Sequence, residues 1–348
     1  MNLEGMTAVQ KQYQLVRGKG SFKLVLEDAA VVPPQDHEIL IRMRAVSLNR
    51  RDLMVATGQY PTSLADRLVP VSDGAGEVVA VGSQAKRFKV GDRVAPTFFQ
   101  NWDSGRSSHK IGVSTLGNGG ESGGLLSQYV TLHERGAVAV PGYLSFEEAA
   151  TLPCAALTAW SALFTHGQLR AGDQVLLQGT GGVSIFGLQF ARAAGATGII
   201  TSSSDAKLAR AKAHGAVVGI NYKTMPEWEK AVLAATNNLG VQHVVETGGA
   251  GTLAQSLASM GFGCHVGLIG GLTAFGGDIP VSALRGRNAS ATGITVGSRA
   301  EFEAMLIFME LYRIQPVIDK SFAFPAAMAA YEYLDTGSHF GKVVIRIG

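Results

Sequence analysis

The chain contains 348 residues, of which 46% are hydrophobic and 16% are charged, and its formal net charge is +3. A chain of this length exceeds the size at which one hydrophobic core stops growing, so we expect two domains. The composition excludes a disordered protein, and the apolar runs are too short to predict a membrane span. Because the basic residues are scattered, we expect neither a nucleic-acid surface nor a membrane surface.

Residues 1–145 predict a compact antiparallel β domain. Short alternating or β-branched runs are separated there by Gly and Pro. The predicted strands are 13–16, 39–46, 76–81, 93–96 and 128–132. The Gly- and Ser-rich stretch 104–124 is interpreted as a surface lobe or loop.

Residues 146–290 predict a doubly wound parallel sheet, because apolar runs alternate there with helical periodicity. The predicted strands are 174–178, 198–202, 217–221, 243–247 and 265–269, and the predicted helices are 183–194, 206–214, 226–238 and 251–260. Residues 291–348, with a helix over 299–313 and a strand over 342–347, are expected to return to the first domain. A ligand is expected at the carboxyl ends of the parallel strands.

A glycine-rich turn joins the first of these strands to its helix. Gly179 and Gly181 allow a tight turn and a close backbone approach, and the helix that follows offers free N–H groups to phosphates. Ser184 stands where the third glycine of a dinucleotide fingerprint is usual. The alternative is an ordinary strand-to-helix turn, but the surrounding alternation favours a nicotinamide-dependent oxidoreductase.

The two cysteines, Cys154 and Cys264, are too few for a disulfide framework. Residues 1–10 lack the basic and apolar regions of a signal peptide. We therefore expect a cytoplasmic protein.

Several motifs, in order along nearly the whole chain, resemble the medium-chain dehydrogenase/reductase superfamily of alcohol dehydrogenases and quinone reductases. They are Ser-Leu-Asn-Arg-Arg-Asp at 47–52, Gly-Glu-Val-Val-Ala-Val-Gly at 76–82, Phe-Lys-Val-Gly-Asp-Arg-Val at 88–94, Leu-Pro-Cys-Ala-Ala-Leu-Thr-Ala-Trp at 152–160 and Gly-Ser-His-Phe-Gly-Lys-Val-Val at 337–344. The resemblance implies a GroES-like β domain, an inserted Rossmann domain and an active-site cleft between them. It also implies a homodimer or a tetramer, paired through an edge strand at 289–296.

The resemblance also assigns the positions of the metal ligands found in some members. Asn49, Ser72 and Cys154 occupy the three positions of the catalytic zinc ligands, with Asp73 beside the second. A catalytic zinc needs three Cys, His or acidic ligands, so we expect no metal and a likeness to the quinone oxidoreductase branch. The lobe at 102–124 contains no cysteine for a structural zinc site. Cys154 is interpreted as a small packed residue.

Three residues are the candidates for catalysis. By family position, Asn49 is expected nearest the nicotinamide and the substrate oxygen, although it equally suits the cap of a helix that begins near Arg50. Tyr60 is a candidate proton donor or pocket residue, or else a turn aromatic that covers the core. Thr158 lies near the nicotinamide in the relatives. Asp52 is expected to make structural hydrogen bonds rather than to act as a base.

The end of the second strand of the doubly wound sheet predicts the nucleotide preference. An acidic residue there would bind the ribose hydroxyls of NADH, but this chain has serines at 202–204, so we expect NADPH. In the quinone reductases, positions matching Ser203, Lys207 and Tyr222 surround the 2′-phosphate. The alternative is that Ser204 only caps the next helix and Lys207 is a solvated charge.

The glycine turn and the resemblance together define the expected NADPH contacts. They are Thr158, Gly179, Thr180, Gly181, Gly182, Val183, Ser202, Ser203, Ser204, Lys207, Tyr222, Gly248, Ile269, Gly270, His339, Phe340 and Lys342.

The expected reaction follows from the missing metal. Hydride transfer to a quinone or to an α,β-unsaturated carbonyl (an enone) places charge on a conjugated oxygen, which needs hydrogen-bond donors rather than a Lewis acid. The first alternative is an alcohol dehydrogenase or aldehyde reductase of the same superfamily. The alternative of another class is an NADPH-binding protein, similar to a crystallin or an interaction protein, without a defined reaction.

Overall fold

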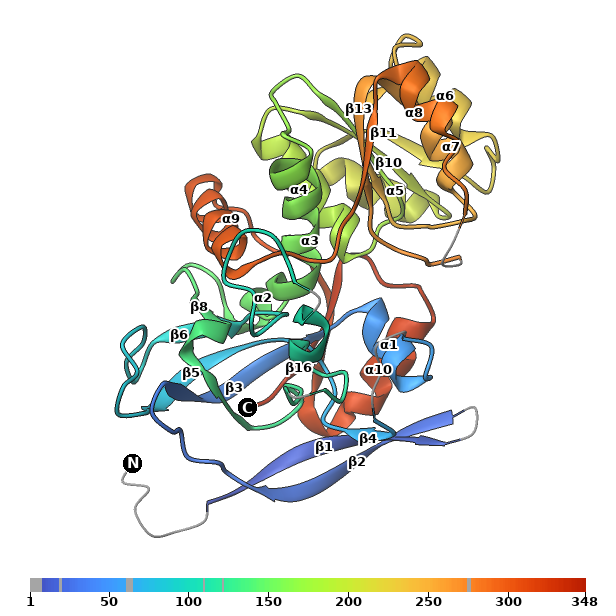
Figure 1. Cartoon of the computed structure of the whole chain (residues 1–348). Coiled ribbons are helices and arrows are strands. Elements are labelled where there is room, and N and C mark those ends of the chain that lie inside the picture. Colours follow the sequence, from blue (N-terminus) through green and yellow to red (C-terminus); the bar gives the residue numbers. More distant parts are fainter. Residues whose placement is uncertain (1–7, 19–20, 61–64, 109, 121, 274–276) are drawn as a thin grey trace. The chain divides into compact units, whose positions relative to one another are not determined.

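The computed structural model of the chain describes residues 8–18, 21–60, 65–108, 110–120, 122–273 and 277–348. Of the sequence expectations, those on residues 1–7 and on His109 and Glu121 lie outside the described residues. Two compact units are present, and each is treated by itself (Figure 1). The first comprises Met1–Cys154 and Gly297–Gly348, and the second comprises Ala155–Val296.

The first unit is built mainly of β-strands. Its strands are β1 (Val9–Gly18), β2 (Ser21–Ala30), β3 (Glu38–Leu48), β4 (Arg67–Leu68), β5 (Asp73–Val81), β6 (Arg93–Pro96), β7 (Tyr129–His133), β8 (Ala137–Ala139), β15 (Ile318–Ala323) and β16 (Lys342–Arg346). Its helices are α1 (Arg50–Ala56), α2 (Phe146–Ala149), α9 (Arg299–Tyr312) and α10 (Ala327–Asp335), with the 3₁₀ turns η1 (Ile111–Ser114), η2 (Glu134–Gly136) and η5 (Phe324–Ala326). The chain leaves this unit within the π-helical turn η3 (Leu152–Ala156).

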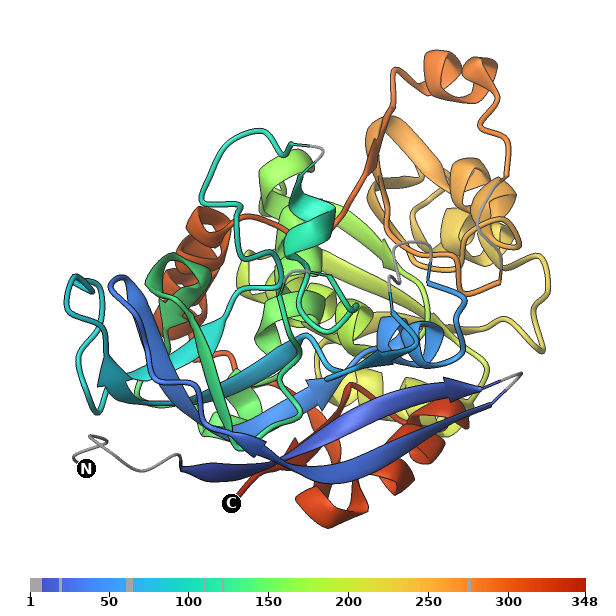
Figure 2. The same cartoon turned by 60° about the horizontal axis from the view of Figure 1, so that its bottom comes forward.

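Two sheets organise these strands. One has the order β2-β1-β4, and the other has the order β15-β16-β3-β5-β6-β8, with β7 paired to β3. Figure 2 shows β1 and β2 as a long hairpin, in which Val9 lies opposite Ala30 and Gly18 opposite Ser21. The strands within residues 1–145 pair antiparallel, as expected, and β16 pairs antiparallel with β3. β15 and β16, which lie outside that range, are parallel.

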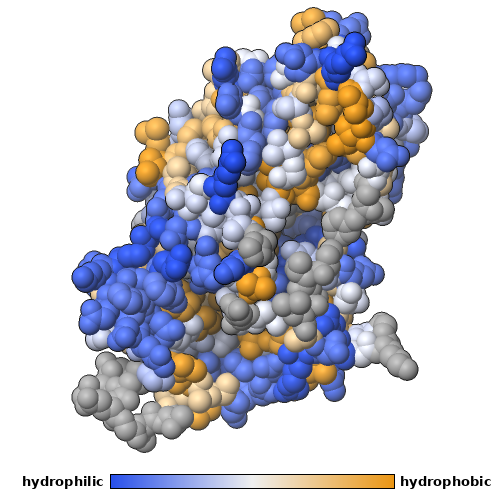
Figure 3. All heavy atoms as spheres, viewed as in Figure 1, coloured by the Kyte–Doolittle hydropathy of each residue, from blue (hydrophilic) through white to orange (hydrophobic). Residues whose placement is uncertain are grey.

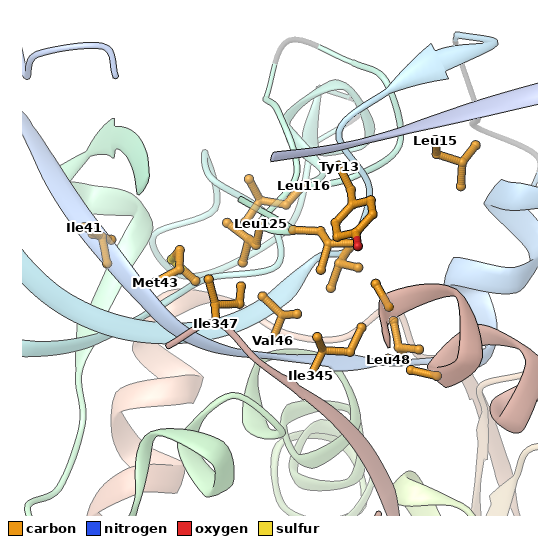
Figure 4. Close-up of a cluster of buried hydrophobic side chains, with 14 of the residues drawn as sticks. Tyr13, Leu15, Ile41, Met43, Val46, Leu48, Leu116, Leu125, Ile345 and Ile347 are labelled. Atoms are coloured by element: carbon orange, nitrogen blue, oxygen red, sulfur yellow. The ribbon is translucent and has the colours of Figure 1, made fainter. Parts of the chain in front are cut away.

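The hydrophobic core of the first unit lies between these sheets and helices α1 and α10 (Figure 4). Tyr13 and Leu15 of β1 face Met43, Val46 and other side chains of β3 and β16 across this core. Over residues 41–45 of β3, buried apolar residues alternate with the half-buried Arg42 and Arg44, which follows from the two-residue period of a strand.

The boundary between the units differs from the expected residue 145. Helix α2 packs against β3, β5 and β16, so it belongs with the first unit, and the division falls between Cys154 and Ala155. The return to the first unit falls between Val296 and Gly297 instead of after residue 290. β14 causes that second difference, because it pairs with β13 of the second unit.

The second unit alternates strands and helices. Its strands are β9 (Gln174–Leu177), β10 (Thr197–Ser202), β11 (Ala216–Asn221), β12 (Val241–Glu246), β13 (Met260–Leu268) and β14 (Ser290–Gly293). Its helices are α3 (Leu157–Trp160), α4 (Gly182–Ala193), α5 (Asp205–Ala213), α6 (Trp228–Ala235), α7 (Leu253–Ala258) and α8 (Val281–Arg287), with the π-helical turn η4 (Ser161–His166).

The sheet of the second unit has the order β11-β10-β9-β12-β13-β14 with all pairs parallel. This is the strand order of a dinucleotide-binding Rossmann sheet, so the predicted fold class is confirmed. β14 forms one edge of the sheet. It lies within the stretch expected to pair across a dimer, and that pairing stays a prediction.

The stretch at 104–124 is only partly the surface lobe that its composition suggests. Its described residues 104–108 are exposed, but Ser114 to Asn118 are buried and Leu116 joins the core of the first unit. Composition misses this because glycines also allow close packing; a Cβ on Gly117 would come within 2.7 Å of the Val71 backbone.

The outer surface mixes polar and apolar side chains, as the face drawn in Figure 3 shows. Within the described part of the chain, no helix combines the length and the apolar character needed to cross a membrane.

Candidate functional site

The glycine turn of the second unit lies where β9 ends and α4 begins. Gly179 has a φ of +71°, in the left-handed region that favours glycine. Gly181 is the N-cap of α4, and a Cβ built on it would have no protein atom within 4 Å. The turn therefore presents open space at the first N–H groups of a twelve-residue helix. Ser184 Oγ donates to Gln178 O, which accounts for a serine at the third glycine position.

The residues expected at the 2′-phosphate lie at the ends of β10 and β11. Ser202 is the last residue of β10, and Ser203 and Ser204 lead into α5. Ser204 caps that helix, since its Oγ accepts the backbone N–H of Lys207 at 3.4 Å. Ser204 therefore has the alternative role of a helix cap. Tyr222 follows β11, and its side chain is exposed.

A buried carboxylate organises the adjoining loop at the end of β12. Glu246 is 1% exposed, and its Oε1 accepts the backbone N–H groups of Gly248 and Gly249, both at 2.9 Å. The Thr252 hydroxyl also donates to Oε1, at 2.6 Å, and the Ser256 hydroxyl donates to Oε2. The backbone near Gly248, an expected cofactor contact, is thus fixed by one side chain.

Two further expected contacts follow β13. The backbone N–H groups of Ile269 and Gly270 both donate to the carbonyl of Glu246, at 2.9 and 3.3 Å. Because β9, β10, β12 and β13 are parallel, these residues and the glycine turn share the carboxyl edge of one sheet. Thr158, in α3 of the same unit, is 4% exposed.

The first unit holds a separate cluster of buried polar groups around Asn49. Asn49 immediately precedes α1, and its backbone N–H donates to Asp52 Oδ2 at 2.7 Å. Its side-chain Oδ1 accepts from Lys342 Nζ, which also donates to the carbonyl of Leu48 at 2.8 Å. Asn49 therefore has the predicted capping position, but Lys342 binds its side-chain oxygen.

Asp73 is the second centre of this cluster. Its Oδ1 accepts from the Ser72 hydroxyl at 2.7 Å, and its Oδ2 accepts from the backbone N–H of Cys154 at 3.0 Å. Val71, directly before this pair, is fully buried with a φ of +76°. A β-branched residue in that region is strained, so the surrounding packing holds this backbone in place.

A buried arginine completes the cluster and contacts the candidate Tyr60. Arg51 Nη1 donates to Asp52 Oδ1 at 3.2 Å and to Leu116 O at 3.1 Å. Its guanidinium lies 4.9 Å from the centre of the Tyr60 ring and 5.2 Å from that of Phe98. Tyr60 thus faces a buried cation. Asp52 makes the structural hydrogen bonds that were expected of it.

Burial shifts the ionisation of these groups. It raises the pKa of Asp52 to about 6, against the effect of Arg51, and it raises the pKa of Asp73, against the effect of Lys342. Burial also raises the pKa of the Cys154 thiol, and the Asp73 charge adds to that rise, so the thiol stays protonated. Burial lowers the pKa of Lys342, whereas the charge of Asp73 favours its ammonium form.

Some of the residues expected at the functional site contact one another in the structure, and others do not. In the first unit Asn49 and Lys342 are in contact, whereas Phe340 is a fully buried residue just before β16 and His339 is half-buried. The cofactor contacts expected of these C-terminal residues stay predictions. In the second unit the remaining expected contacts are at the strand ends or, for Thr158, in α3.

Sequence reasoning missed Arg51 and Glu246 as organising groups. Each is a charged residue beside or within an apolar stretch of the sequence. Buried charges are rare unless they are paired, so such a position could have indicated a charged group with several partners.

The second unit fits a nicotinamide dinucleotide. The open space at Gly181, the helix N-terminus and the shared edge of parallel strands match what a pyrophosphate and two nucleosides need. A zinc ion does not fit the three positions in the first unit. Lys342 donates to the Asn49 oxygen, the Ser72 hydroxyl donates to Asp73, and Cys154 is the one of the three with a side chain that zinc prefers. Within the described ranges, no group of three or more His, Cys, Asp or Glu side chains is arranged to hold a metal ion.

These features define a dinucleotide-dependent oxidoreductase with a β domain and a Rossmann unit. The family described as "Alcohol dehydrogenase GroES-like domain" matches residues 35–142, and the one described as "Zinc-binding dehydrogenase" matches residues 182–310. The zinc-type alcohol dehydrogenase-like protein of Schizosaccharomyces pombe is 44% identical over 316 residues, which cover 89% of this chain and 91% of that protein. The chain belongs to the medium-chain dehydrogenase/reductase superfamily.

Two further comparisons agree with that assignment. The crystal structure of a putative alcohol dehydrogenase from Sinorhizobium meliloti 1021 has a TM-score of 0.91 and 41% identity, covering 98% of this chain and 99% of that one. The human quinone oxidoreductase is 26% identical over 326 residues, which cover 91% of this chain and 92% of that protein. The chain is therefore similar to proteins named for two different reactions.

Proposed function

We propose that the protein is a cytoplasmic, NADPH-dependent reductase that transfers hydride to a quinone or an enone without zinc. The observation that carries the proposal is the state of the three zinc-ligand positions. Lys342 donates to the Asn49 oxygen, Ser72 donates to Asp73, and only Cys154 has a side chain that zinc prefers. A metal with too few ligands cannot polarise a carbonyl, so the reaction must use a substrate that needs little polarisation.

Conjugated acceptors meet that requirement. When bound, reduced nicotinamide supplies a hydride, and the negative charge that forms on a quinone or enone is delocalised onto its oxygen. The side chains of the first unit proposed to bind that oxygen are the amide of Asn49 and the hydroxyl of Tyr60. Donors fixed before the reaction stabilise such a charge without reorganisation. The Arg51 guanidinium over the Tyr60 ring holds that side chain in place.

The preference for NADPH is a separate part of the proposal. Ser202, Ser203 and Ser204 place small hydroxyl side chains at the end of β10, where an NADH-binding protein would have an acid. Lys207 lies in the first turn of α5, and its position favours binding of a 2′-phosphate.

A specific observation favours a second candidate reaction. The relatives with 44% and 41% identity are named as alcohol dehydrogenases or proteins like them, whereas the human quinone oxidoreductase has 26% identity. Oxidation of an alcohol with NADP⁺, or reduction of an aldehyde, is therefore the alternative.

A panel of acceptors tests the proposal. Oxidation of NADPH is followed with quinones, enals, enones and saturated aldehydes, and reduction of NADP⁺ is followed with primary and secondary alcohols. The cofactor-site variant Gly181→Val serves as the blank. We expect turnover of quinones or enones, with hydride at the β-carbon of the enone. Turnover of alcohols and saturated aldehydes alone would replace the proposal with the second candidate. Rates equal to those of the variant on every substrate would favour a binding protein.

A further inference from the structure

Strand β2 has one edge without a partner strand. It is the end strand of the sheet with the order β2-β1-β4, and it pairs with β1 along its whole length, from Ser21 to Ala30. No other strand in the described part of the chain pairs with it. The backbone N–H and C=O groups along such an edge are free to bond to another extended chain. The outer edge of β2 is therefore a candidate interaction surface of the first unit.

The register of the β1–β2 hairpin identifies the backbone groups that face outward. The backbone N–H of Val31 donates to Ala8 O at 2.7 Å, and these two residues continue the register of the hairpin. Because hydrogen-bonded and non-hydrogen-bonded pairs alternate in an antiparallel ladder, the odd-numbered residues of β2 bond to β1. The backbone groups that point away from β1 are those of Phe22, Leu24, Leu26 and Asp28.

We propose that β2 pairs antiparallel with β2 of a second copy of the chain, across a twofold axis at Val25. In such a pair the outward groups of one strand bond to the outward groups of the other. A twofold axis at residue 24, 25 or 26 meets this condition and leaves most of the strand paired. A twofold contact joins the same surface of both copies, so it closes both edges at once.

The charged side chains select the axis at Val25. With that axis Lys23 lies opposite Glu27 of the second copy, and the symmetry repeats this pair. An axis one residue to either side would place Lys23 opposite an apolar residue, Val25 or Ala29. Lys23 is exposed and has no ion pair within the described residues, whereas Glu27 is paired with Arg67. Lys23 of the second copy therefore extends an existing ion pair, and opposite charges directly across a ladder are stabilising.

The same axis matches apolar side chains. Leu26 is 43% exposed, and the axis places it opposite Leu24 of the second copy, a half-buried residue that packs against the core of the first unit. Val25 lies opposite its own copy in a non-hydrogen-bonded pair, where side chains are closest and β-branched pairs are favourable. This contact belongs to the first unit. It is therefore separate from the pairing expected through β14, and it does not depend on the proposed reaction.

Disulfide trapping tests the axis. In Val25→Cys the two Cα atoms across the axis would be about 4.5 Å apart, within the range of a disulfide bond. We expect mild oxidation to give a covalent dimer on a non-reducing denaturing gel. Wild type is the blank for Cys154 and Cys264. Ala29→Cys, on the same face of β2, is the matched control, since it would be about 27 Å from its own copy. No covalent dimer from folded Val25→Cys, or an equal yield from Ala29→Cys, overturns the proposal.

A charge reversal tests the pairing of Lys23 with Glu27. Lys23→Glu in the Val25→Cys background places like charges opposite each other at both symmetric positions. We expect the rate of cross-linking to fall about 10-fold, because two repulsive pairs replace two attractive ones. Lys86→Glu in the same background changes an exposed lysine outside β2 and is expected to have no effect. Equal rates for the two charge variants would overturn the register.

A measurement on wild type covers variants that do not fold. Backbone hydrogen exchange is followed at low and high protein concentration. We expect the segment 21–30 to exchange more slowly at high concentration, because the outward N–H groups of Leu24 and Leu26 become bonded to the second copy. β5, an inner strand of the other sheet, is the internal control and is expected to be unchanged. Exchange of 21–30 that does not depend on concentration would overturn the proposal.

Discussion

The side chains of Gln178 and Glu246 are hydrogen bonded, with the Gln178 Nε2 atom 2.6 Å from Glu246 Oε2. Gln178 follows β9 and Glu246 ends β12, so this bond joins the central strands at the edge where the cofactor is expected. Gln178 Oε1 in turn accepts the backbone N–H groups of Thr247 and Gly248, at 3.1 and 3.0 Å. One amide and one carboxylate thus hold the loop after β12.

Glu246→Gln is expected to loosen that loop. Five donors face the Glu246 carboxylate, and an amide replaces one acceptor oxygen with an NH₂ group that faces some of these donors. Hydrogen bonds to a charged group contribute about 1.5 to 3 kcal/mol each, so we expect a loss of unfolding free energy of that order. Urea unfolding measures it, and KM for the cofactor is expected to rise. The exposed Glu227→Gln variant is the control, and equal midpoints for the two variants would contradict the prediction.

Stability is expected to fall in mild acid because of His265. Burial, together with the neighbouring His243 and His166, lowers the pKa of His265 to about 4. Its Nε2 has no hydrogen-bond partner among the described residues. Between about pH 6.5 and pH 4 the unfolded chain binds a proton here that the folded protein does not bind, so stability decreases as the pH falls.

The expected slope is at most about 1.4 kcal/mol per pH unit from this one histidine. His265→Leu removes the titrating group, so its unfolding free energy should fall less steeply between pH 6.5 and pH 5 than that of wild type. Denaturant unfolding at several pH values measures both slopes. Parallel pH profiles would show that His265 is not responsible.

The alternation of strands and helices after residue 174 was predictable because it depends on local signals. Buried parallel strands are continuous apolar runs, and glycines mark the turns where they end. β2 was not predicted because its sequence lacks such a local signal. Its residues alternate between exposed and half-buried positions, and it has polar residues on both faces.

Contacts between distant residues could not be predicted from the sequence. Lys342 and Asn49 are separated by 293 positions, and the motif that contains Lys342 suggested only a cofactor contact. The parallel pairing of β15 with β16 was missed for the same reason, because strand pairing depends on the tertiary fold. Glycine spacing, by contrast, located the turn at Gly181 correctly at the start of a helix.

Gly181→Val is expected to abolish cofactor binding without unfolding the protein. Gly181 has a φ of −78°, and a Cβ there meets no protein atom within 4 Å, so valine fits the apoprotein. The side chain would instead fill the space proposed for the pyrophosphate. We expect a loss of at least about 100-fold in affinity, or about 2.7 kcal/mol, by cofactor fluorescence titration. Gly286→Val, also without a neighbour within 4 Å, is the matched control. Unchanged cofactor binding in a folded Gly181→Val protein would mean that the turn is not the pyrophosphate site.

Purified protein is expected to contain no stoichiometric zinc and to keep its activity after dialysis against a chelator. The reason is the donor set at Asn49, Ser72 and Cys154, of which only Cys154 has a side chain that zinc prefers. Elemental analysis of the protein, before and after dialysis, measures the metal, and the acceptor panel measures the activity. One zinc per chain together with loss of activity on chelation would disprove a metal-free reaction.

NADPH is expected to be preferred over NADH, and Lys207 is expected to cause much of the preference. Lys207 lies in the first turn of α5, after the serines that end β10, and its backbone N–H donates to Ser204 Oγ. A charge-assisted contact between its ammonium and the 2′-phosphate contributes about 1.5 to 3 kcal/mol. Lys207→Ala should therefore weaken NADPH binding by about 10- to 100-fold and leave NADH binding nearly unchanged. Because the helix cap uses the backbone of residue 207, the substitution keeps α5 intact.

The exposed Lys223→Ala variant, after β11, is the control for a general loss of positive charge. Titrations with both cofactors measure the effect, and equal losses for the two, or a wild-type preference for NADH, would contradict the assignment of the 2′-phosphate site.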